Sequence, residues 1–192
     1  MHHIYTSQSL ILKRQPLETS ASFYILTKDL GLIRARAQGV RRQESRLKGT
    51  LQEFSLATIA YVRAKSGWKI TTAIPEKNLY YELKDKTTQA IVVHIANVLI
   101  RFISGEESNA TMFTTVTTGF ASMIEGHVDP LVVEILILAR VLSLLGYVAK
   151  TPDTEVLFED LTDFSPPLIT TALGVKSVLV QAINKAFQES HL

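Results

Sequence analysis

The hydrophobic pattern changes its period near residue 80, and this change constrains the fold more than any other feature. From Tyr5 to Glu76 apolar and polar residues alternate with a period of two, which predicts β-strands. After Tyr80 the apolar residues recur at spacings of three and four, which predicts helices. We therefore expect an α+β chain with two domains, a small β-barrel over residues 1–78 and an all-α helical domain over residues 79–192.

Five strands are expected in the first domain, which suits a small barrel. They cover Ser9–Arg14, Ser22–Thr27, Leu32–Ala37, Phe54–Lys65 and Trp68–Pro75. Asp29-Leu30-Gly31 and Ser66-Gly67 read as tight turns, because glycine adopts backbone angles that other residues avoid. The polar stretch from Gly39 to Gly49 has no strand pattern. Alternation places four residues on one side of the last strand: Trp68, Ile70, Thr72 and Ile74.

Four helices are expected in the second domain. They cover Ala90–Ile103, Thr111–Ile124, Pro130–Leu145 and Gly174–Gln188. Asp129 is the predicted N-cap of the third, with Pro130 in its first turn. This helix is apolar on several sides, which is typical of the centre of a bundle. The segment Thr151–Pro167 is acidic and irregular.

Charge divides the chain in the same place. The formal net charge is only +2. Residues 1–80 nevertheless carry thirteen Lys and Arg against five Asp and Glu, a net +8, whereas the remainder carries seven against thirteen, a net −6. A strongly basic domain joined to an acidic one indicates a nucleic-acid surface on the first.

The candidate DNA-binding residues are the cations of this basic half and one tyrosine. Arg34 and Arg36 share a strand face, while Ile33 and Ala35 point to the core. Tyr61, near Arg63, is the expected base-stacking residue, whereas Trp68 is expected in the core. A merely solvated charged surface is the alternative interpretation. The candidates are Lys13, Arg14, Arg34, Arg36, Arg41, Arg42, Arg46, Lys48, Tyr61 and Arg63.

The sequence offers no catalytic, metal-binding or cofactor-binding residues. It has no cysteine, which excludes disulfides, thiol nucleophiles and thiolate zinc sites and suits the cytoplasm. No phosphate-cradling glycine loop, nucleophile elbow or helical histidine pair is present. The longest apolar stretch, Pro130 to Val148, contains Glu134 and Arg140, which favours a buried helix over a membrane span.

The order of motifs in the first domain resembles the amino-terminal OB-fold domain of the RecO family, bacterial mediators of DNA repair and recombination. The matching runs are Leu10-Ile11-Leu12-Lys13-Arg14, Phe23 to Thr27, Gly31 to Arg42, Ser45-Arg46-Leu47-Lys48-Gly49 and Leu51-Gln52-Glu53-Phe54. In the second domain, Arg140 followed by Leu144-Leu145-Gly146-Tyr147 is similar to the family's central helix. Many family members carry a four-cysteine zinc module after that helix, and this chain lacks the cysteines.

The resemblance implies a non-enzymatic, cytoplasmic, nucleoid-associated protein without cofactors. Such a protein would bind single- and double-stranded DNA, anneal complementary strands, engage the acidic C-terminal tail of single-stranded DNA-binding protein, and help load RecA together with RecR. It implies that the DNA surface comprises the cations from Lys13 to Lys48. Arg140 is either part of an apolar groove for that tail or a buried structural residue.

Two other classes of function stay open. The same cations would suit an RNA-binding or ribosome-associated OB-fold module. Alternatively, the chain is a non-catalytic protein-interaction adaptor whose acidic helices form the working surface.

Overall fold

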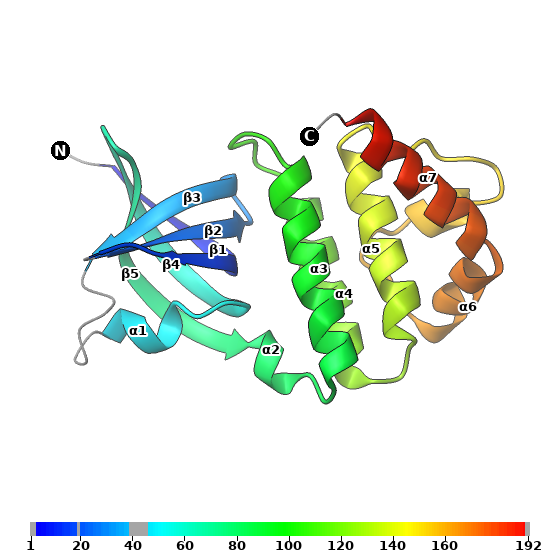
Figure 1. Ribbon diagram of the computed structural model, residues 1–192, viewed down its shortest axis with the longest axis horizontal. Coiled ribbons are helices and arrows are strands. Elements are labelled where there is room, and N and C mark those ends of the chain that lie inside the picture. Colours follow the sequence, from blue (N-terminus) through cyan, green and yellow to red (C-terminus); the bar gives the residue numbers. More distant parts are fainter. Residues whose placement is uncertain (1–2, 19, 39–45, 191–192) are drawn as a thin grey trace. The chain divides into compact units, whose positions relative to one another are not determined.

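The first part of the chain forms a closed five-stranded barrel (Figure 1). The computed structural model describes residues 3–18, 20–38 and 46–190. The strands are β1 (Ile4–Pro16), β2 (Ser20–Thr27), β3 (Gly31–Gln38), β4 (Ser55–Ala64) and β5 (Gly67–Asn78), with the short helix α1 (Arg46–Thr50) between β3 and β4. All five expected strands are present. β1, β3 and β5 extend beyond both predicted limits and β2 beyond its first, whereas β4 is one residue shorter than predicted at each end.

The strands run in the order β1-β2-β3-β5-β4 around the barrel. Antiparallel pairing of β1 with β4, from Ile4↔Val62 to Leu10↔Leu56, closes it. β3 and β5 are parallel and share two register pairs, Ala35↔Trp68 and Arg36↔Lys69. This arrangement, followed by helices, confirms the predicted α+β fold with an OB-type barrel.

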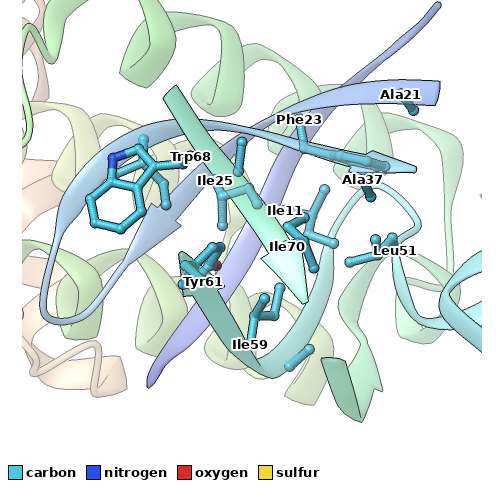
Figure 2. Close-up of a cluster of buried hydrophobic side chains, with 13 residues drawn as sticks. Ile11, Ala21, Phe23, Ile25, Ala37, Leu51, Ile59, Tyr61, Trp68 and Ile70 are labelled. Atoms are coloured by element: carbon cyan, nitrogen blue, oxygen red, sulfur yellow. The ribbon is translucent and has the colours of Figure 1, made fainter. Parts of the chain in front are cut away.

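Side chains from all five strands fill the barrel, and those of β3 alternate strictly between inside and outside. Along β3 the residues Ile33, Ala35 and Ala37 are buried, whereas Arg34 and Arg36 are exposed. Figure 2 shows Trp68 and Tyr61 together with aliphatic residues of this core. The alternation along β3 follows because one face of this strand is buried and the other meets solvent.

Only half of the face predicted for β5 is buried. Trp68 and Ile70 lie in the core, but Thr72 is exposed and Ile74 is 65% exposed. The register between β4 and β5 shifts between Ala60 and Tyr61, where an irregularity interrupts the ladder. Such a shift changes which side chains face inward, so simple alternation fails beyond it.

The turn at Gly31 requires glycine for two reasons. Its φ is +72°, a conformation that a Cβ disfavours. In addition, a Cβ built on Gly31 would lie 2.3 Å from the carbonyl oxygen of Glu107. The predicted turn before β3 is therefore present, and the backbone of Glu107, distant in sequence, packs against it.

The remaining elements are helical. They are α2 (Leu79–Glu82), α3 (Lys86–Phe102), α4 (Ala110–Glu125), α5 (Pro130–Leu144), the 3-10 helix η1 (Glu155–Phe158), α6 (Pro166–Gly174) and α7 (Lys176–Glu189). Asp129 caps α5 as predicted, accepting a hydrogen bond from the Leu131 amide at 2.9 Å. Helix α6 was not predicted, although Ser165 followed by two prolines is a helix-start signal.

Arg140 has a structural role inside the helical unit. Its side chain is fully buried in α5 and donates to the carbonyl oxygens of Leu157 (2.8 Å), Leu161 (3.1 Å) and Asp163 (2.8 Å). Burial lowers its pKa to about 10. The guanidinium holds the segment after α5 in place, so the structure contradicts its assignment to a peptide-binding groove.

The chain divides into two compact units. The first contains residues up to Glu82 together with Ser104–Ala110, and the second contains Leu83–Ile103 and the residues from Thr111 onward. Segment Ser104–Ala110 therefore lies outside the predicted 1–78 domain but belongs to the barrel unit. Among the described helices, none alone has the length and apolarity to cross a membrane; α6 and α7 meet that test only as a pair bent by 75°.

Candidate nucleic-acid interface

The outer face of β1, β2 and β3 carries a row of two cations with a tyrosine between them. Lys13 is paired with Tyr24, and Tyr24 is paired with Arg34. Directly opposed residues share a sheet face, and neighbouring strands lie about 4.8 Å apart. The guanidinium of Arg34 lies 5.4 Å from the centre of the Tyr24 ring. The row thus combines positive charge with a half-buried aromatic ring.

Hydrogen bonds hold the Arg34 side chain along this face. Its Nε donates to Ser22 Oγ at 3.0 Å, and one terminal nitrogen donates to Gln15 Oε1 at 2.9 Å. Both partners are neutral, so they orient the guanidinium without cancelling its charge. A fixed guanidinium binds a phosphate with little loss of side-chain entropy.

A second row lies two residues further along β3. Ser22 is paired with Arg36, and Arg36 is paired with Lys69 of β5. Positions 34 and 36 are about 7 Å apart along the strand. The outward register positions of these two rows are Lys13, Gln15, Ser22, Tyr24, Arg34, Arg36 and Lys69, and none is acidic. We call this set the cationic face.

Arg14 does not belong to the cationic face. A register shift between Ile11 and Lys13 turns Lys13 outward and places Arg14 opposite the buried Phe23. Arg14 is half-buried, and its backbone amide donates to the carboxylate of Glu53 at 2.8 Å. Adjacent residues of a strand face opposite sides, and the bulge decides that Lys13 rather than Arg14 faces outward.

Arg63 also lies apart from the cationic face. It is paired in register with Trp68, and its guanidinium lies 4.8 Å from the centre of the indole. Its charge is balanced by an ion pair with the carboxylate of Glu106. Arg63 thus covers part of the barrel core and already has an anionic partner.

Tyr61 cannot stack on a base in this structure, so its prediction as the stacking residue is wrong. It is 0% exposed and forms a hydrogen bond of 2.7 Å with Ser9 Oγ. Burial raises the pKa of the Tyr61 hydroxyl. The register pairs Tyr61 with Ile70, which places both on the core side of the hairpin.

Four predicted cations cannot be placed. Arg41 and Arg42 lie outside the described residues. Arg46 and Lys48 belong to α1, but their side chains also lie outside what the structure describes. Their roles in DNA binding stay predictions.

The structure adds Lys69 and Tyr24 to the candidate site. Lys69 joins Arg36 only because β3 and β5 are parallel neighbours, a pairing that local sequence does not reveal. Tyr24 lies in the strongly apolar strand β2, which gave no sign of a binding residue. The structure pairs it with the cations Lys13 and Arg34 on the neighbouring strands. No group of three or more acidic or histidine side chains suited to a metal ion occurs within residues 3–18, 20–38 and 46–190.

Comparison with known proteins agrees with the barrel and with the motif order. Residues 1–74 match the family model described as Recombination protein O N terminal. A curated relative, "DNA repair protein RecO" from Thermoanaerobacter sp. (strain X514), is 22% identical over 156 residues. The match covers 78% of this chain and 61% of that relative, so the chain spans less than two thirds of the relative's length. These two matches confirm the predicted resemblance: residues 1–74 are similar to the amino-terminal domain of the RecO family, and the longer match is to a DNA repair protein of that name.

Proposed function

We propose that the chain is a DNA repair and recombination mediator that binds single- and double-stranded DNA on the cationic face. The observation that carries this proposal is the placement of Lys13, Arg34, Arg36 and Lys69 on adjacent strands with no acidic residue between them. OB-folds bind oligonucleotides across the face of their second and third strands. The cationic face occupies that region.

Strand annealing follows from the same surface. Two complementary strands repel each other through their phosphates, and bound cations reduce this repulsion so that bases can pair. No covalent bond changes, so the proposed activity is not enzymatic and needs no cofactor.

The proposed partners are those that the resemblance to the RecO family implies. We propose that the chain engages the C-terminal tail of single-stranded DNA-binding protein and acts with RecR to load RecA at the nucleoid. The cationic face is reserved for DNA in this scheme, so the protein partners would use other surfaces.

A fluorescence-anisotropy titration tests the DNA-binding proposal. Single-stranded oligomers are titrated with the full chain at several salt concentrations. Four phosphate contacts predict a slope of log affinity against log salt of about −3, at about −0.7 per contact. Arg34→Gln and Arg36→Gln should each reduce the magnitude of the slope by about 0.7.

Lys77→Gln is the matched control, because it removes one exposed cation from β5 outside the cationic face. Equal losses in Lys77→Gln and Arg36→Gln would show that net charge alone drives binding. Tighter binding of RNA than of DNA of the same sequence would favour an RNA-binding module. Salt-independent or absent binding would favour a protein adaptor.

A further inference from the structure

A hollow of about 200 Å³ opens beside the end of the cationic face. Its lining comprises Ser20, Arg36, Gln38, Ser66, Lys69 and Ile70. Ile70 is 7% exposed and provides an apolar wall, whereas the other residues are polar or charged. The volume corresponds to about seven liquid waters, which is enough for a phosphate group and part of a sugar.

The strand pairing explains why this hollow exists. β3 and β5 share register pairs only at Ala35↔Trp68 and Arg36↔Lys69 among the described residues. Beyond Arg36 the two strands are no longer paired, so a seam opens between Gln38 and Ile70. The hollow is therefore built into the closure of the barrel.

The chemistry of the lining favours an anion. Arg36 and Lys69 are exposed neighbours, and neither side chain has a hydrogen bond or ion pair within the described part of the chain. Two serine hydroxyls and the Gln38 amide add neutral donors, and no lining residue is acidic. A guanidinium binds phosphate oxygens in pairs, while an ammonium acts as a point charge.

The cationic face ends at this hollow. On β4, the next strand around the barrel, the residue paired with Lys69 is the uncharged Val62. Val62 is in turn paired with Ile4 of β1, an apolar residue that is 60% exposed. Among the cations that the structure places on this face, Arg36 and Lys69 are therefore the last that a bound DNA strand would meet.

The end of a DNA strand differs from its interior in the kind of phosphate group that it carries. A phosphodiester carries one negative charge, whereas a terminal phosphate monoester carries about −1.5 to −2 near neutral pH and has three acceptor oxygens. Two adjacent cations with neutral donors match the monoester better than the diester. We propose that the hollow binds the terminal phosphate monoester of a DNA strand, so that the protein prefers phosphorylated ends; this rests on the proposed DNA binding.

The test compares three oligomers of one sequence: 5′-phosphorylated, 3′-phosphorylated, and unphosphorylated. We expect one phosphorylated form to bind about tenfold more tightly than the unphosphorylated form, as one or two charge-assisted hydrogen bonds would produce. Arg36→Gln and Lys69→Gln should each reduce that ratio to about one or two. Arg34→Gln is the matched control: it should weaken binding of all three oligomers by a similar factor and keep the ratio.

The outcomes separate this proposal from DNA binding itself. Equal affinities for the three oligomers with a retained salt slope would overturn the phosphate site and leave the proposed function intact. Absence of binding to every oligomer would overturn both. Since Arg36 and Lys69 are exposed, their variants should melt like the parent; a preference that persists in both folded variants would also overturn the site.

Discussion

Arg63 and Glu106 form an ion pair at the end of the barrel, and the same arginine covers the Trp68 indole. The cation that the sequence placed on the DNA surface is thus neutralised by an acidic residue from the segment between α3 and α4. The Arg63 charge therefore forms contacts within the barrel unit and is not free for a phosphate.

We therefore expect Arg63→Gln to change DNA affinity less than Arg34→Gln does. The ion pair is exposed and contributes about 0–1 kcal/mol to stability, and the contact with the indole adds about 0.5–1 kcal/mol. Anisotropy measures the affinities, and urea denaturation measures the stability. An affinity loss in Arg63→Gln equal to that in Arg34→Gln would return Arg63 to the DNA surface.

Tyr24 is the expected stacking residue in place of Tyr61. Tyr24→Leu should weaken oligomer binding by about 1–3 kcal/mol, because a stacked base loses its aromatic partner. Tyr24→Phe keeps the ring and should bind almost as the parent does. If both variants bind equally, the Tyr24 ring contributes only packing.

The buried hydroxyl of Tyr61 makes the barrel sensitive to alkaline pH. The folded state holds the proton more strongly than the unfolded state, since burial raises the pKa of Tyr61 above the ordinary value of about 10. Above about pH 10 the unfolded state binds fewer protons, so stability falls as pH rises. Tyr61→Phe should show a smaller fall in urea denaturation between pH 9 and 11. At neutral pH it should lose about 0.5–1.5 kcal/mol with its hydrogen bond to Ser9, and its DNA affinity should be unchanged.

Gly31→Ala should destabilise the barrel unit by about 1–3 kcal/mol or more, because a left-handed conformation and a backbone clash coincide there. Gly49→Ala is the matched control. Gly49 lies in α1 with nothing within 4 Å of a built Cβ, so its substitution should be neutral or stabilise by up to about 1 kcal/mol. Equal melting temperatures for the two variants would contradict the close approach of Glu107.

Features that depend only on neighbouring residues in the sequence could be predicted. Arg34 and Arg36 face outward as expected, because burying one face of β3 fixes the orientation of every residue in it. Asp129 caps α5 because an N-cap depends only on its immediate neighbours.

Features that depend on long-range pairing were not predictable. The bulge that turns Lys13 rather than Arg14 outward forms where β1 pairs with β2, and barrel closure makes Arg36 and Lys69 neighbours. The burial of Tyr61 depends on the β4–β5 register, which shifts at that residue. In each case a contact between distant strands decides the orientation, and the pattern along one strand does not reveal that contact.

The approach of Glu107 to Gly31 has a consequence for dissecting the protein. Because Ser104–Ala110 belongs to the barrel unit, the polypeptide passes from one unit to the other after Glu82, again after Ile103, and a third time after Ala110. A gene fragment ending at Glu82 would encode five strands without the piece that rests on their turn. Each unit consists of two separate stretches of the chain, so cutting the coding sequence at one point cannot yield either unit complete.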